Sequence, residues 1–119
     1  MKDITSKEDI QYMVDCFYDS ILADDLLNPF FTNLNFQHHL PKMVDFWAFV
    51  LLDESGYTAD VTKKHLKMKI GKEHFNRWIE LFKTTVNDLF VGPNAEKAIQ
   101  RAHLIRWTIE SKIDQSKTT

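Results

Sequence analysis

The sequence predicts an all-α fold with four main helices. Only three glycines and three prolines interrupt its 119 residues, and no stretch alternates apolar and polar residues as a half-buried strand does. Four stretches instead repeat apolar residues every three or four positions, the spacing of a helix with one buried face. A chain of this length fits a single domain, 1–119, in which we expect a core over about 8–113 and a disordered tail at 114–119.

The first helix starts in the run Thr-Ser-Lys-Glu at 5–8. This run has the pattern of a capping box, in which Thr5 and Glu8 satisfy free N–H groups at the helix start. The inward residues, spaced along one helix face, are Ile10, Met13, Val14, Phe17 and Ile21. The helix fades at 23–25, and Asn28-Pro29 predicts a turn, because a residue before proline avoids helical geometry.

The second helix is expected to begin near His38 or His39. Pro41 then lies in its first turn, since a proline deeper in a helix loses a backbone hydrogen bond and clashes with the preceding turn. The inward residues are His39, Met43, Phe46, Trp47 and Val50. The run 53–57 ends this helix, and the lysine-rich segment around His65 is expected to form only short helical turns within irregular chain.

A third helix is predicted over about 72–90 and a fourth from there to about 113. Gly92-Pro93 separates them, because glycine ends helices readily and proline suits a first turn. The inward residues of the third are Phe75, Trp78, Ile79, Phe82, Val86 and Leu89, and those of the fourth are Ala95, Ala98, Ile99, Ala102, Ile105 and Ile109.

Charge and composition argue against several classes of partner. Five lysines lie within 63–72, but the net charge is −2, so we interpret this cluster as a solvated face and expect no nucleic acid. The single cysteine, Cys16, can form no internal disulfide, which is compatible with a reducing compartment. No apolar run has the length of a signal core or a membrane span, so we expect a cytoplasmic protein with no membrane partner.

Four residues are of types that a purely hydrophobic core does not require. They are Tyr18, His39, His65 and Trp78. Each alone has an ordinary structural interpretation, but together they fit a metal ligand on one side of a plane and hydrogen-bond donors on the other. His65 lies between the aromatic-rich stretches 46–52 and 75–82, and a neutral imidazole is a common axial ligand of haem iron.

These residues belong to a longer pattern that resembles group III truncated haemoglobins, the short globins with a two-over-two arrangement of helices. The matching stretches are Phe17-Tyr18, Leu22-Ala23-Asp24-Asp25, Asn28-Pro29-Phe30-Phe31, residues 39–47, Tyr57, Lys64-His65-Leu66, Phe75-Asn76-Arg77-Trp78 and Arg101-Ala102. They follow one another in the family's order over nearly the whole chain. The resemblance implies a two-over-two helical sandwich that encloses haem b.

The resemblance also implies a role for individual residues. His65 corresponds to the proximal ligand of the iron, and Tyr18, Trp78 and His39 correspond to the distal tyrosine, tryptophan and histidine. Phe31 corresponds to the phenylalanine that packs on the haem face. The further cofactor-binding residues are Lys42, Met43, Phe46, Trp47, Ile70 and Phe75. Lys42 either pairs with a haem propionate or is simply solvated.

The implied function is the binding of dioxygen and other diatomic ligands at ferrous haem. Tyr18 and Trp78 can donate hydrogen bonds to such a ligand, and at about 1–2 kcal/mol each they slow oxygen release on the order of 10²-fold. Because an oxygen carrier must release its ligand, we expect redox or ligand chemistry with peroxide, nitric oxide or oxygen in preference to oxygen transport. We expect an unidentified reductase as partner and a monomer or weak dimer, and whether the chain is an enzyme stays open.

Several alternatives stay open at this point. His39 can gate ligand entry, donate a hydrogen bond or coordinate the iron itself, and we favour gating. A non-haem metal enzyme is disfavoured, because His38 and His39 are adjacent and point to different helix faces, with no carboxylate set beside them. The alternative function is a cofactor-free helical interaction module, whose aromatic residues form only a core and a partner groove.

Overall fold

The computed structural model confirms the predicted all-α architecture. It describes residues 1–54 and 70–117, and of 114–117 it describes only the backbone. The elements are α1 (Lys7–Leu22), the short 3₁₀ helix η1 (Asn28–Phe30), α2 (Phe36–Leu52), α4 (Lys72–Leu89) and α5 (Pro93–Lys117). No strand occurs in the described ranges. The connection at 55–69, with the predicted short turns, Tyr57 and His65, lies outside the described residues.

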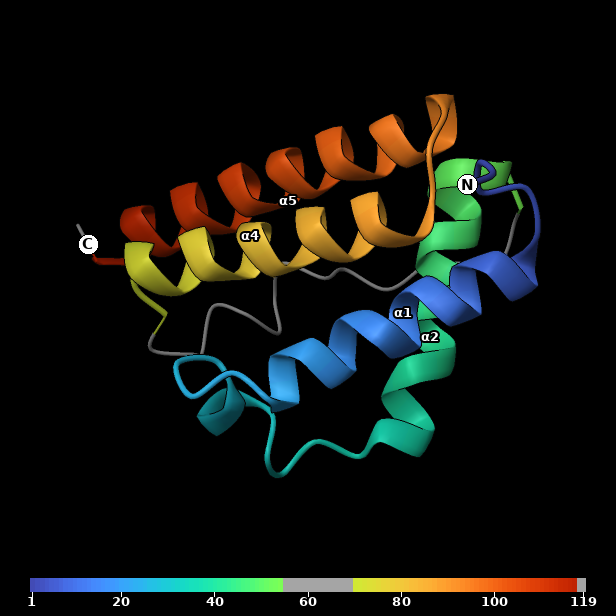
Figure 1. The fold of residues 1–119 in the computed structure, drawn as a ribbon. Coiled ribbons are helices and arrows are strands. Elements are labelled where there is room, and N and C mark those ends of the chain that lie inside the picture. The colour runs from blue at the N-terminus through green and yellow to red at the C-terminus, as the bar shows by residue number, and fades with distance from the viewer. Residues whose placement is uncertain (55–69, 118–119) are drawn as a thin grey trace.

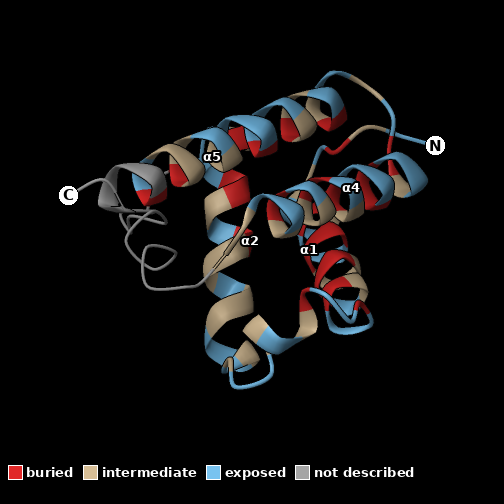
Figure 2. Ribbon diagram, turned by 90° about the vertical axis from the view of Figure 1, so that its left-hand side faces the viewer, coloured by how far each residue is buried: buried red, intermediate tan, exposed pale blue. Residues whose placement is uncertain are grey.

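The four long helices form two layers of two (Figure 1). Helix α4 packs against α5 in one layer, and α1 packs against α2 in the other. Contacts between α1 and α4 and between α2 and α5 join the layers, so each helix packs on two others. Figure 2 shows that the buried residues lie on the faces that the helices turn toward one another. None of the helices in the described part of the chain is both long and apolar enough to cross a membrane.

The predicted inward face of α1 is confirmed, but its cap lies one residue later than predicted. Ser6 caps the helix, and its side chain accepts the N–H of Asp9 at 3.2 Å. Asp9 in turn accepts the N–H of Ser6 at 3.2 Å, so the capping box joins Ser6 to Asp9 and not Thr5 to Glu8. The physical reason is the reach of Asp9, whose carboxylate also binds the Lys2 ammonium and the Thr5 N–H.

The predicted start of α2 was wrong. The helix begins at Phe36, because Asn35 caps it: its side chain accepts the N–H of His38 at 3.3 Å. Pro41 therefore lies inside the helix and not in its first turn. A proline here has no N–H to donate to the Gln37 carbonyl, and Gln37 is an exposed residue. The early start places Phe36 on the same helix as His39.

The buried faces of α4 and α5 are those predicted, but α5 ends later than predicted. The buried residues include Phe75, Ile79, Phe82 and Val86 on α4, with Ala95, Ala98, Ala102 and Ile109 on α5. Helix α5 continues to Lys117, whereas we predicted an end near 113. The expected disordered tail is thus helical as far as Lys117, and 118–119 lie outside the described residues.

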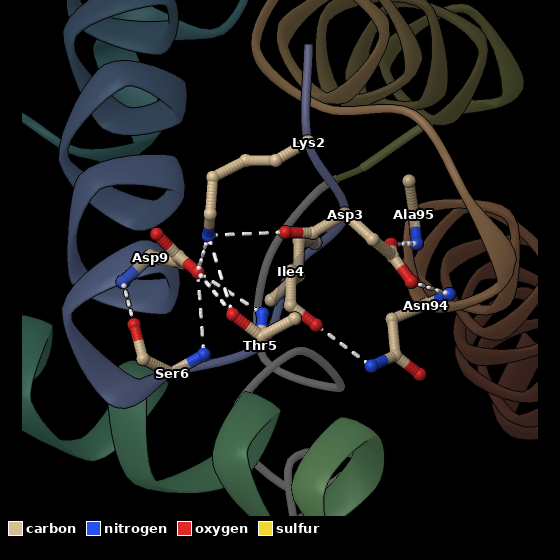
Figure 3. Close-up of polar contacts among 8 residues, drawn as sticks. All are labelled: Lys2, Asp3, Ile4, Thr5, Ser6, Asp9, Asn94 and Ala95. Carbon is tan, nitrogen blue, oxygen red and sulfur yellow. Dashed lines mark hydrogen bonds and ion pairs between the residues drawn. The ribbon is translucent and has the colours of Figure 1, made fainter.

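An N-terminal arm, residues 2–5, ties the start of α1 to the start of α5 (Figure 3). The Asp3 carboxylate accepts the N–H of Asn94 at 3.0 Å and of Ala95 at 2.9 Å, which satisfies free donors at the N-terminus of α5. Asn94 donates from its side chain to the Ile4 carbonyl at 2.7 Å, and the Ile4 side chain is fully buried. The arm therefore caps a helix that begins some 90 residues later in the chain.

We expect the charge of Asp3 to make the stability of the fold depend on pH. Burial raises the pKa of Asp3, but hydrogen bonds from Asn94, Ala95 and Ile4 together outweigh it, so the pKa lies below its ordinary value. Such a group adds stability above its unfolded pKa of about 4 and loses it as the pH falls through the folded pKa. Asp3→Asn should lower the free energy of unfolding by about 0.5–1.5 kcal/mol at pH 7.

Urea unfolding of both proteins at several values between pH 7 and pH 2 measures this effect. The difference between wild type and Asp3→Asn should shrink as the pH falls below about 4, because Asp3 takes up a proton first in the unfolded and then in the folded protein, and the wild type loses the charge that the variant lacks. A difference that stays the same down to pH 2 would show that the charge of Asp3 contributes nothing to the cap.

Candidate functional site

The structure brings Tyr18 and His39 together from two different helices. Tyr18 Oη lies 2.7 Å from His39 Nε2, at hydrogen-bonding distance, and the two rings meet edge to face at 5.2 Å between centroids. Tyr18 lies on the inner side of α1, next to Phe17, and is 9% exposed. His39 lies one turn after the Asn35 cap of α2 and is half-buried.

The Tyr18 ring is surrounded by other aromatic rings. Phe17, Phe31 and Phe36 each meet the Tyr18 ring edge to face, at centroid distances of 5.4, 5.9 and 6.1 Å. Burial raises the pKa of Tyr18 above its ordinary value, so the hydroxyl keeps its proton and remains a hydrogen-bond donor. Phe36 was missed from the sequence, because we expected the helix to start after it. The Asn35 cap was the signal that could have placed it.

The direction of the hydrogen bond between Tyr18 and His39 depends on the imidazole tautomer. When Nε2 carries no proton, the Tyr18 hydroxyl donates to it. When Nε2 carries a proton, His39 donates to the Tyr18 oxygen, and the hydroxyl proton is directed away from His39. The pair therefore holds a proton donor whose direction is set by a titratable side chain.

Trp78 joins the same cluster through two rings of the core. It meets Phe17 edge to face at 5.7 Å and stacks on Phe82 at 5.9 Å. Phe82 also stacks on Trp47 at 5.1 Å, and Trp47 meets Phe46 at 5.2 Å. A continuous series of ring contacts thus runs from Tyr18 on α1, through α4, to Phe46 on α2.

The other predicted site residues divide between two apolar clusters. Phe31, Met43, Phe46 and Trp47 belong to the main core with Tyr18 and Trp78. Ile70 and Phe75 lie in a second cluster with Ile109 and Ile113, and Ile105 packs against both clusters. Lys42 is half-buried on α2. The predicted iron ligand His65 lies outside the described residues.

An apolar cavity lies between α2 and α5 and borders both clusters. Its volume is about 200 Å³. The lining residues are Phe46, Phe49, Val50, Arg101, Leu104, Ile105, Thr108 and Ile109. Phe46 was predicted as a site residue, whereas the contribution of α5 was not, because its periodicity indicated only an inward face.

Comparison with known proteins shows which family this chain belongs to. The chain matches the model of the bacterial-like globins over residues 2–111. The group 3 truncated hemoglobin ctb of Campylobacter jejuni is 30% identical over 107 residues, which cover 84% of each chain. The crystal structure of a group III truncated hemoglobin from Campylobacter jejuni superimposes with a TM-score of 0.86 at 28% identity, over 95% of both chains. A mutant of the truncated hemoglobin from Tetrahymena pyriformis, in its Fe(III) form, superimposes with a TM-score of 0.70 at 25% identity, over 87% of both chains.

The described residues fit the cofactor of this family, which is haem b. Aromatic rings supply flat apolar walls, while Tyr18, His39 and Trp78 place a hydroxyl, an imidazole and an indole N–H in one cluster. The family assignment also argues against the cofactor-free interaction module. The chain belongs to the bacterial-like globins, and its likeness to the Campylobacter jejuni protein places it among the group III truncated haemoglobins.

Proposed function

We propose that this globin holds dioxygen and other diatomic ligands tightly at haem b and uses them in redox or ligand chemistry with oxygen, peroxide or nitric oxide, and not in bulk oxygen transport. The observation that carries the proposal is the 2.7 Å hydrogen bond between Tyr18 and His39 inside an aromatic cluster that includes Trp78. These hydrogen-bond donors would impair a protein that carries oxygen reversibly, because each added donor slows oxygen release.

Haem, when bound, supplies an iron centre that takes a diatomic ligand and changes its oxidation state. We assign His65 as the proximal ligand of that iron, on the residue pattern it shares with the family. Tyr18 would donate a hydrogen bond to the diatomic ligand when His39 donates Nε2–H to the Tyr18 oxygen. Trp78 adds a second donor, since an indole N–H can only donate. Both bonds gain strength where aromatic rings exclude water.

His39 has a second role in this proposal, at the entrance. Its half-buried ring can swing aside to admit a ligand, and in the closed position it orients the Tyr18 hydroxyl. A protonated imidazole there can also deliver a proton through the Tyr18 oxygen, which reduction of peroxide requires. Lys42, three residues further along α2, is assigned to a haem propionate. The remaining wall is assigned to Phe31, Met43, Phe46, Trp47, Ile70 and Phe75.

The redox proposal has consequences for the partners of the protein. Catalytic turnover needs electrons from outside the chain, so we propose an unidentified reductase as the donor. We place the protein in the cytoplasm, as a monomer or weak dimer, where such a reductase can reach the haem edge. The other partners are dioxygen and related diatomic ligands.

Visible absorption spectra of the ferric and dithionite-reduced protein test the cofactor and its ligand. Wild type should show an intense violet haem band, which His65→Gly weakens or shifts and added imidazole partly restores. His103→Gly is the matched control, because His103 is exposed on α5, and it should keep the wild-type spectrum. A colourless wild-type protein that also fails to respond to added haemin would refute the proposal.

A further inference from the structure

Asp24 is a buried carboxylate that joins the end of α1 to α4. Its side chain is only 5% exposed. Oδ1 accepts the backbone N–H of Leu26 at 3.0 Å and of Leu27 at 3.2 Å, while Oδ2 accepts a hydrogen bond from Arg77 Nε. Asp24 and Arg77 are 53 positions apart in the sequence, so the pair is a tertiary contact.

The pair joins two opposite charges at the edge of the core. Burial raises the pKa of Asp24, but the Arg77 guanidinium and the N–H groups of Leu27 and Leu26 outweigh it, so the pKa lies below its ordinary value. A buried carboxylate that loses its partner is strongly unfavourable, which ties the turn after α1 closely to the Arg77 side chain. Arg77 is itself 43% exposed and also contacts Glu80 at 3.4 Å, so the charge pair lies at the rim of the core.

The pair lies where the two helices with the proposed donors meet. Arg77 directly precedes Trp78 on α4, and Asp24 follows Tyr18 by six residues. Phe17 packs between these helices, against both Tyr18 and Trp78. A second contact, between Phe30 and His74 at 4.9 Å, holds η1 against α4 just before Phe31 reaches the Tyr18 ring.

We propose that Asp24 and Arg77 are positioning residues for ligand binding: by fixing the end of α1 and the following turn against α4, the pair sets the spacing between the Tyr18 hydroxyl and the Trp78 indole. This inference rests on the function proposed above. Hydrogen bonds weaken steeply with misalignment, so a shift of about 0.5 Å in either donor is enough to weaken its bond to a small ligand.

Arg77→Gln tests the inference with three measurements on the haem-loaded protein. These are the oxygen dissociation rate, the C–O stretching frequency of the carbon monoxide form, and amide hydrogen exchange at 26–27. Arg77→Gln should speed oxygen dissociation roughly three- to tenfold, shift the C–O band and raise amide exchange. Arg77→Lys keeps the positive charge, so all three measurements should lie closer to their wild-type values. The matched control is Lys7→Gln, because Lys7 and Asp45 form an exposed ion pair between α1 and α2 at 3.0 Å. It should behave as wild type.

Two results would overturn the inference. One is a wild-type dissociation rate and C–O band in Arg77→Gln although exchange at 26–27 has risen. The other is a dissociation rate and C–O band in Arg77→Lys that are no closer to wild type than those of Arg77→Gln. If Arg77→Gln does not fold, Asp24→Asn carries the same test, since it keeps the side-chain shape and removes the charge. Tyr18→Phe separates this inference from the proposed function: if only Tyr18→Phe alters dissociation, the positioning role alone fails.

Discussion

Replacing Tyr18 with phenylalanine is expected to speed oxygen dissociation from the ferrous protein by on the order of ten- to a hundredfold. The substitution keeps the ring and its contacts with Phe17, Phe31 and Phe36, and it removes only the hydroxyl. A hydrogen bond to a partly negative acceptor is worth about 1.5–3 kcal/mol, which corresponds to that range of rates. Stopped-flow displacement of oxygen by carbon monoxide measures the rate.

The matched control lies on the same helix. Tyr12 is 57% exposed, so Tyr12→Phe removes a hydroxyl from α1 without altering the cluster and should leave the rate unchanged. Trp78→Phe is the companion variant, since it keeps an aromatic ring against Phe82 and removes the indole donor. If Tyr18→Phe dissociates oxygen at the wild-type rate, Tyr18 is not a donor to the ligand, and the argument for tight binding fails.

The sequence predicted the helix faces well because periodicity is a local signal. An apolar residue every three or four positions determines which side of α1 or α4 is buried, and the structure buries Phe17, Phe82 and their neighbours accordingly. Helix ends were harder, because several polar residues compete for the same free N–H groups. Asp9, and not Glu8, completes the capping box of α1. Helix α2 begins directly after its Asn35 cap, earlier than Pro41 had indicated.

Tertiary pairs were beyond what periodicity can predict. Tyr18 and His39 were expected to lie near each other only through the family resemblance, since a face says nothing about which helix it meets. The pair of Asp24 with Arg77 and the cap that Asp3 gives to α5 join residues far apart in sequence, and no local pattern indicated either. Such contacts depend on how helices cross, which is decided by packing across the whole core.

Gly92→Ala is expected to be among the most destabilising single substitutions outside the site, at about 2–4 kcal/mol. Gly92 has a φ of +139°, a conformation that residues with a side chain rarely adopt. An added Cβ would also lie 2.6 Å from Asp3 Cγ, which forces Asp3 away from the N–H groups it caps. Backbone strain and loss of the cap therefore act together.

Gly71→Ala provides the matched control for this prediction. Gly71 has an ordinary φ of −98°, and a Cβ there would meet no atom closer than His74 Nδ1 at 3.6 Å. The control should change the free energy of unfolding by less than about 1 kcal/mol, measured by urea unfolding beside Gly92→Ala. The double variant Asp3→Ala/Gly92→Ala should lose less than the sum of its parts, because both changes abolish the same cap. Equal stability of Gly92→Ala and Gly71→Ala would mean that the turn before α5 can relax, and that the N-terminal arm does not require glycine there.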